Sequence, residues 1–284
     1  MPLPDFVLGD PRHFTVSYAI NELTDPSVFV DRVKAASQFE RVAGRLGDVA
    51  VVPAPAGYPD FVFLSNSALI VGSVAILARY RHSERRGEEE ALGAWLSSHG
   101  YEIVRLPEEE GLIFEGQGDC RWSHGGRHLW MGYGSGRTTL RGIEAVKTAL
   151  KERGFMIEVH PLHIRDKRTY HLDLCLCPLP NGKVLWHASS FLPAGRATID
   201  RVFGSSALVN VPMKYIYGCN SVVLDSRTLL VPKLAAEGYR SWIAGATGLR
   251  ILEVNVGEFQ KAGGSVSCMV LITRPFATTS RDVR

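Results

Sequence analysis

Cys268, near the end of the chain, is a candidate nucleophile because of the residues that surround it in the sequence. It falls in an apolar run that predicts a buried strand over residues 266–272, and Gly263 and Gly264 let backbone approach closely above the thiol. A free cysteine is more often a silent member of a core than a nucleophile. Nucleophilic catalysis would therefore require a base, a carboxylate that orients it, and groups that hold a substrate.

A candidate base and a carboxylate lie together in residues 170–177. Polar and apolar residues alternate there, and the period of a strand predicts His171, Asp173, Cys175 and Cys177 on one face. His171 and Cys175 would lie about 13 Å apart along the strand, too far to share a zinc ion. We interpret the face as functional rather than metal-binding. A buried histidine hydrogen-bonded to a neighbouring carboxylate is the structural alternative.

Other carboxylates occur next to glycine or proline. Glu115 and Asp119 lie among two glycines directly after an apolar run. Asp60 follows Pro59 at the mouth of a predicted strand that also carries Asn66, and a capped turn is the simpler interpretation of this aspartate.

Arginines at two places in the chain could bind an anion. Arg85 and Arg86 precede a predicted helix, where they are either a solvated pair or a guanidinium grip on a carboxylate. Arg137 follows the glycine-rich residues 132–136. This loop matches no phosphate-binding pattern, because it lacks the Lys-Ser/Thr ending and the three spaced glycines.

The composition of the 284 residues excludes several classes of protein. With 45% hydrophobic and 21% charged residues, the chain is typical of a soluble globular protein, and a net charge of +3 argues against nucleic-acid and membrane partners. Five cysteines without regular spacing argue against a disulfide framework. The sequence shows no leader and no long apolar run, so a cytoplasmic location is expected. No cofactor or metal is implied, and the expected partner is a small molecule.

The elements that must position these residues alternate along the chain. Helices are predicted from a cap at Asp25 to Gly47, and over residues 88–98, 139–153 and 235–244, each followed by a strand: 49–53, 101–106, 155–160 and 250–254. Further strands are predicted over residues 12–19, 61–71 and 74–79, with a hairpin of 170–179 and 183–187. This recurrence predicts an α/β fold of repeated modules of roughly 50 to 60 residues, in a single domain over residues 1–284.

Six segments together resemble the guanidine-modifying family of dimethylarginine dimethylaminohydrolases, arginine deiminases, arginine dihydrolases and amidinotransferases. They are residues 59–63, 81–89, 114–119, 170–179, 219–220 and 259–268. The resemblance runs in order from about residue 14 to residue 271. It implies the fold of that family, a five-bladed α/β-propeller (pentein) of repeated ββαβ modules, which agrees with the recurrence of helix and strand.

The resemblance also implies roles for ten residues. Cys268 corresponds to the family nucleophile, His171 to the general acid and base, and Glu115 to the carboxylate that orients the histidine. Substrate-binding roles fall on Asp60 and Asp173 for the guanidinium, Arg85 and Arg137 for the α-carboxylate, Asp119 and Asn21 for the α-amino end, and Asn66 for a ureido group.

The implied activity is hydrolysis of arginine or N-methylated arginine to citrulline. Asp173 matches deiminases, dihydrolases and amidinotransferases, and Asn66 falls where the dihydrolase-like branch has an asparagine, which extends the reaction to citrulline as a substrate and ornithine as a product. Residues 20–24 read Ile-Asn-Glu-Leu-Thr where that branch has Ile-Asn-Pro-Trp-Met, so the segment that covers the substrate in that branch has a different sequence here. An amidinotransferase and a non-catalytic arginine- or citrulline-binding relative are the alternatives. Assembly into a homo-oligomer is left open.

Overall fold

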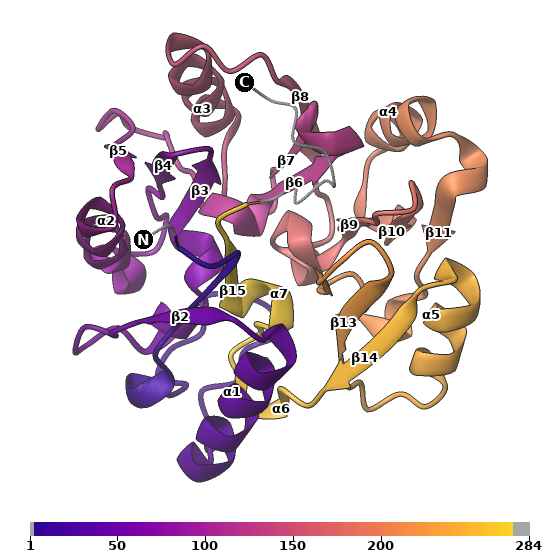
Figure 1. The fold of residues 1–284 in the computed structure, drawn as a ribbon, viewed down its shortest axis with the longest axis horizontal. Helices are drawn as coiled ribbons and strands as arrows, with labels where there is room; N and C mark the ends of the chain where they lie inside the picture. Colours follow the sequence, from indigo (N-terminus) through magenta and orange to yellow (C-terminus); the bar gives the residue numbers. More distant parts are fainter. Residues whose placement is uncertain (1–2, 275–284) are drawn as a thin grey trace.

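The computed structural model describes residues 3–274 of the chain. In this part, five three-stranded sheets form a ring, and one longer helix lies outside each of them (Figure 1). The five helices are α1 (Arg32–Leu46), α2 (Glu88–Ser98), α3 (Leu140–Glu152), α4 (Pro193–Phe203) and α5 (Tyr239–Thr247). The predicted five-bladed α/β-propeller is therefore confirmed.

Each sheet repeats one module. Its first two strands pair antiparallel, and the second and third pair parallel across an outer helix, as a parallel crossover requires. The strands, sheet by sheet, are β15 (Val270–Ile272), β1 (Phe6–Gly9) and β2 (Val49–Val52); β3 (Ala68–Val71), β4 (Val74–Leu77) and β5 (Glu102–Val104); β6 (Cys120–Ser123), β7 (His128–Tyr133) and β8 (Glu158–His163); β9 (Leu176–Pro178), β10 (Val184–Trp186) and β11 (Leu208–Asn210); β12 (Val222–Val223), β13 (Thr228–Pro232) and β14 (Arg250–Val254).

The first and last strands close the ring. β15 pairs antiparallel with β1, with Leu8 opposite Val270, so segments from the two ends of the chain share one sheet. The short helices α6 (Gly257–Gln260) and α7 (Val266–Met269) precede β15, and α7 lies near the centre of the ring in Figure 1. The residues before β15 are thereby held at the hub of the propeller.

Each outer helix packs its apolar face against its own sheet. On α3, Ile143, Val146 and Leu150 recur at helical spacing and are buried in one cluster with Leu129 and Met131 of β7. Burial of one such side chain stabilises the fold by about 1.5–3 kcal/mol. The strands thus become a rigid support for the loops at their inner ends.

Several predicted elements differ from the structure. The first helix begins after Asp31, whose carboxylate accepts from the backbone N–H of Lys34, and not at Asp25. No strand covers residues 12–19, and residues 59–67 form two 3₁₀ turns before the strand Ala68–Val71. The helix Pro193–Phe203 was not predicted, because Ile199 is its one buried residue and gives no apolar period.

None of the helices within residues 3–274 combines the length and the apolar character needed to cross a bilayer.

Candidate active site

A small pocket at the hub brings predicted residues from distant segments together. Six of the ten line it: Asn21, Asp60, Asn66, Arg85, Arg137 and Cys268. The other four, Glu115, Asp119, Asp173 and His171, are buried and are linked to the pocket residues or to one another by the contacts described below. The pocket volume is about 10 Å³, no more than one water molecule requires. A molecule of amino-acid size can therefore enter only if part of the wall moves.

Cys268 lies in the helical turn α7 and not in a strand, which begins two residues later at Val270. A short buried run gives the same apolar pattern as helix or strand, which is why the strand prediction was wrong here. The buried thiol donates to Oδ2 of Asp173 at 3.1 Å and accepts from Nδ2 of Asn220 at 3.2 Å. Burial, reinforced by the charge of Asp173, raises the pKa of the Cys268 thiol well above its usual value. The nucleophile candidate is therefore a protonated thiol in the free protein.

His171 and Glu115 form a buried pair. Nε2 of His171 lies 2.7 Å from Oε2 of Glu115, and the same oxygen accepts from Nη1 of Arg137 at 2.8 Å. Burial alone would raise the pKa of Glu115, but the charge of Arg137 and the bond with His171 outweigh it and hold that pKa far below its usual range. Within the described residues, Nδ1 of His171 is buried without a hydrogen-bond partner. Glu115 thus fixes the imidazole through one nitrogen and leaves the other available for proton transfer.

Asp119 bonds to the backbone beside His171. Its oxygens accept from the backbone N–H of Leu172 at 3.0 Å and of Thr138 at 3.3 Å. Burial raises the pKa of Asp119 to about 6. These bonds fix the backbone next to His171, and Asp119 is not among the residues that line the pocket. Its contact with the α-amino end of a substrate stays a prediction.

Asp60 and Asp173 supply two carboxylates near the thiol. Asp60 lies in the 3₁₀ turn Pro59–Val62 and lines the pocket; burial raises its pKa against the opposing charge of Arg85. Oδ1 of Asp173 is buried and has no hydrogen-bond partner in residues 3–274. A buried acceptor without a donor is costly, so this oxygen suits a ligand that brings an N–H group.

The polar face predicted for residues 170–177 is only partly present. His171 directly precedes a 3₁₀ turn, Leu172–Leu174, which contains Asp173, and the strand begins at Leu176. Cys175 and Cys177 instead pack in two separate hydrophobic clusters. Alternation in sequence fails here because a tight turn does not keep the two-residue period of a strand.

Arg85 is held inside the protein. Its Nη2 lies 2.6 Å from Oε2 of Glu88, its Nη1 donates to Oδ1 of Asn66 at 2.9 Å, and its guanidinium lies over the ring of Tyr80. The sequence prediction missed Glu88, although its spacing of three residues from Arg85 is a signal for a helical ion pair. Asn220 lies in the segment 219–220 that resembles the family, but the sequence prediction gave it no role.

The segment of Ile20 and Asn21 forms one wall of the pocket. Asn21 and Thr24 both donate to the carbonyl of Ala262, at 3.1 and 2.8 Å, and Arg137 donates to the carbonyl of Ile20 at 2.8 Å. Three hydrogen bonds thus hold this segment at the wall of the pocket. They are few enough that a local movement could open the pocket.

Comparison with known proteins identifies relatives that cover most of the chain. The profile of the family described as "N,N dimethylarginine dimethylhydrolase, eukaryotic" matches residues 25–274. The chain is 31% identical to the N(G),N(G)-dimethylarginine dimethylaminohydrolase of Mycobacterium tuberculosis, covering 95% of this chain and 86% of that protein. It is 32% identical to the bifunctional arginine dihydrolase/ornithine cyclodeaminase AgrE of Nostoc, over 95% of this chain but 38% of that protein.

A solved structure is also similar over almost the whole chain. The N-terminal domain of ArgZ, described as an arginine dihydrolase of cyanobacteria and crystallised with its substrate, superposes with a TM-score of 0.86 at 29% identity. The match covers 94% of this chain and 97% of that domain. The chain therefore corresponds to one domain of the longer bifunctional relatives and spans less than half of their length.

Proposed function

The chain belongs to the N,N-dimethylarginine dimethylhydrolase family, and we propose that it is a cysteine-dependent hydrolase of arginine-type guanidinium compounds. One observation carries the proposal. The thiol of Cys268 lies 3.1 Å from Oδ2 of Asp173, while the other oxygen of that buried carboxylate has no partner among the described residues. A guanidinium edge that donates to Asp173 would bring its central carbon next to the sulfur.

The remaining groups suit the rest of an arginine molecule. Asp60, on the pocket wall, can take a second edge of the planar cation. Arg137 also lines the pocket, and its Nη2 is bonded to the carbonyl of Ile20. Movement of the covering segment would free this N–H for the substrate α-carboxylate. Arg85 has fewer N–H groups left for a substrate carboxylate, because its guanidinium already bonds to Glu88 and Asn66.

The chemistry proceeds in two additions at the guanidinium carbon. The bound cation offsets the charge of Asp173 and lowers the thiol pKa, so Cys268 gives its proton to His171 when substrate binds. The thiolate adds to the carbon, His171 protonates the departing nitrogen, and ammonia or a methylamine leaves a covalent thiouronium. His171 then removes one proton from water, which adds to the same carbon. The C–S bond breaks, the remaining hydroxyl proton passes to the sulfur of Cys268, and the ureido product leaves.

A product assay tests the proposal. The protein is incubated with arginine, with N-methylated arginines and with citrulline, and ammonia, methylamines, citrulline and ornithine are measured. Cys268→Ser should lose turnover while keeping its circular dichroism spectrum, because a hydroxyl is a far weaker nucleophile here. Turnover of no guanidinium compound by the wild-type protein, or a Cys268→Ser variant with more than about a hundredth of its activity, would contradict the assignment.

A second reaction, from citrulline on to ornithine, is favoured by the position of Asn66. The Asn66 side chain lines the pocket. Its Nδ2 lies against Gly118, and so does Nδ1 of His171: a Cβ atom added to Gly118 would be 2.2 Å from the first nitrogen and 3.3 Å from the second. The amide therefore lies beside the nitrogen that would handle the attacking water. Two cyanobacterial relatives are named arginine dihydrolases, which supports the same proposal.

An amidinotransferase would use the same nucleophile and base but pass the amidino group to an amine. Adding glycine to the arginine assay separates the two reactions, since a transferase yields guanidinoacetate and ornithine without ammonia. The ring of five sheets supports the proposal that the chain acts as a single catalytic domain. Cytoplasmic location and self-assembly stay predictions.

A further inference from the structure

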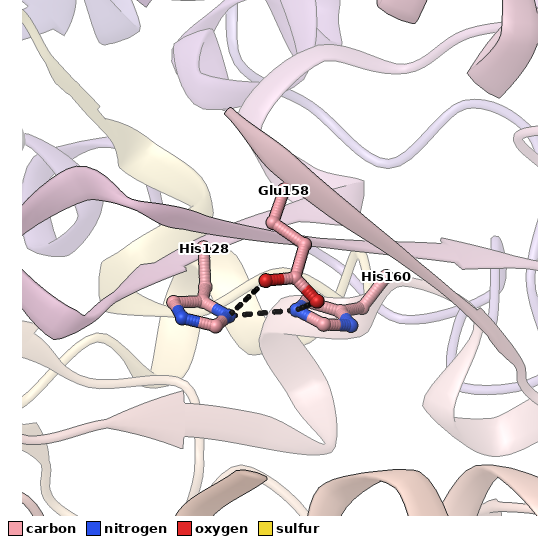
Figure 2. Close-up of side chains that lie close together, drawn as sticks. All are labelled: His128, Glu158 and His160. Carbon is pink, nitrogen blue, oxygen red and sulfur yellow. Dashed lines mark hydrogen bonds and ion pairs between the residues drawn. The ribbon is translucent and has the colours of Figure 1, made fainter. Parts of the chain in front are cut away.

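A second group of side chains that can bind a ligand lies on the sheet of β6, β7 and β8. His128 begins β7, and Glu158 and His160 lie two residues apart at the start of β8. The period of two puts Glu158 and His160 on one face of the strand, and the parallel register sets His128 directly opposite Glu158. Figure 2 shows the carboxylate of Glu158 reaching toward both imidazoles.

We propose that His128, Glu158 and His160 form a binding site for a divalent transition-metal ion, with zinc as the ion it fits best. Two imidazoles and one carboxylate are ligands that zinc takes in proteins, whereas calcium and magnesium prefer oxygen alone. The ligands come from two strands that α3 separates in sequence, so the ion would join β7 to β8.

The spacing of the three ligand atoms fits this ion. Nδ1 of His128 lies 2.8 Å from Nε2 of His160. The Glu158 oxygens lie 3.7 Å from the first nitrogen and 3.5 Å from the second. Ligands held about 2.0–2.1 Å from a tetrahedral zinc ion lie about 3.3 Å from one another. The two imidazoles therefore need to separate by only about half an ångström, and the ion replaces the single proton that their nitrogens share.

The histidine at the centre of the group is held in place before any ion binds. The His160 side chain is 7% exposed and stacks on Trp130, with ring centroids 4.4 Å apart. Trp130 is fully buried, and its indole N–H donates to Oγ of Ser123. At its Nε2 edge, His160 meets Nδ1 of His128, with ring centroids 5.0 Å apart and nearly parallel ring planes. A fixed ligand loses little conformational freedom on binding, which distinguishes this group from a solvated surface pair.

The other two ligands give access from solvent. The His128 side chain is 20% exposed and that of Glu158 is 65% exposed. An ion can therefore reach the group without unfolding of the sheet, and a water molecule can fill the fourth position of a tetrahedral site.

The site is separate from the pocket around Cys268. Gly132, four residues beyond His128 on β7, is the position that lies against Asp119. Four residues of strand span about 13 Å, so the ion would not touch the proposed reacting atoms. Its expected effect is on stability, because it would join the starts of two parallel strands and would bind the folded chain only.

Zinc titration of the untagged, chelator-treated protein tests the site. Because the thiol of Cys268 is itself a zinc ligand candidate, the test uses the Cys268→Ser background. We expect one zinc ion per chain by equilibrium dialysis and metal analysis, together with a zinc-dependent rise in Tm. Cobalt should give visible bands typical of tetrahedral N and O ligands, without the near-ultraviolet band of a thiolate ligand.

Two variants and two matched controls decide the assignment. Glu158→Gln and His128→Gln should abolish the bound equivalent and the rise in Tm, while circular dichroism confirms that both fold. Glu152→Gln, which changes a carboxylate about as exposed as Glu158, and His99→Gln, which changes an exposed histidine, should leave both unchanged. Absence of zinc binding at micromolar zinc, or binding that survives in both site variants, would overturn the proposal.

Discussion

Nη2 of Arg121 lies 3.5 Å from Oδ2 of Asp173 and donates to Oγ of Ser267 at 2.7 Å. Asp173 accepts from the thiol of Cys268, and Ser267 precedes Cys268 in the chain. Arg121 on β6 therefore contacts one of the groups that bond to the thiol, Asp173, and also the residue that precedes Cys268 in the chain. It also supplies the positive charge that partly compensates the buried Asp173 in the absence of a cationic ligand.

We expect Arg121→Gln to destabilise the protein by about 2 kcal/mol, because a charged hydrogen bond and the compensation of a buried carboxylate are lost together. Urea unfolding in the Cys268→Ser background measures this change. Added arginine should restore more stability to Arg121→Gln than to the parent, since the guanidinium of the ligand replaces the missing cation. The exposed Arg240→Gln serves as the control. Equal stabilisation by arginine in all three proteins would show that Arg121 does not compensate Asp173.

The thiol pKa gives a second prediction. Burial and then the charge of Asp173 raise the pKa of Cys268, so the thiol stays protonated at neutral pH. Alkylation by iodoacetamide should accordingly be slow at pH 7 and accelerate as the pH rises toward that raised pKa. Asp173→Asn removes the charge and lowers the thiol pKa, so alkylation of Cys268 at pH 8 should be several-fold faster than in the wild type.

Peptide mass spectrometry assigns the alkylated cysteine in that experiment. The other four cysteines are also buried and serve as internal controls for unfolding. An unchanged rate at Cys268 in Asp173→Asn, with the four others unmodified, would mean that the aspartate does not set the reactivity of the thiol.

Glu115 provides a prediction about the base. Glu115→Gln keeps the size of the side chain but removes the charge that pairs with both His171 and Arg137. We expect kcat to fall by about a hundredfold or more, since the imidazole loses its orienting anion and the compensation of its positive form. The solvated Glu108→Gln is the matched control. A kcat within about twofold of wild type would remove Glu115 from the proposed mechanism.

The sequence was sufficient to predict the repeated module, because helix, glycine and strand recur with clear apolar periods. It also selected residues that the fold gathers at one hub, such as Cys268, Asp60 and Asn66. Arg121 could not be found in this way, because its contact with Asp173 depends on how β6 lies beside a turn about fifty residues later. The roles given to the gathered residues stay predictions for the experiments above.

Local geometry at the site was the least predictable part. His171, Asp173 and Cys268 sit in or beside helical turns where alternating or apolar patterns indicated strands. Such turns break the two-residue period, so residues that share a predicted face, such as Cys175 and Asp173, separate in the structure. The group of His128, Glu158 and His160 was missed for a similar reason: its members meet only through the register of β7 and β8.

Asp119 allows a test of stability against pH. Burial raises its pKa to about 6 from an ordinary value of 3.8, so the folded protein holds this proton more tightly than the unfolded chain. Its contribution to stability is complete below the unfolded pKa and is lost as the pH rises through the folded one. Between about pH 4 and pH 7, the stability of the wild type relative to Asp119→Asn should fall by up to about 3 kcal/mol. A pH-independent difference in urea unfolding would contradict the raised pKa.

Whether the reaction continues from citrulline to ornithine should depend on the amide N–H of Asn66. Its Oδ1 accepts from Arg85 at 2.9 Å, and its Nδ2 faces the region of His171. Asn66→Asp keeps an acceptor for Arg85 but loses the N–H donor, whereas Asn66→Ala loses both.

One hydrogen bond to a neutral ureido group is worth about 1–2 kcal/mol. If this donor holds citrulline, the wild type should convert citrulline alone to ornithine, and both variants should slow that step about tenfold. Asn66→Asp should retain more of the arginine-to-citrulline step than Asn66→Ala, because Arg85 keeps its partner. Untouched citrulline beside consumed arginine in the wild type would instead limit the activity to a single hydrolysis.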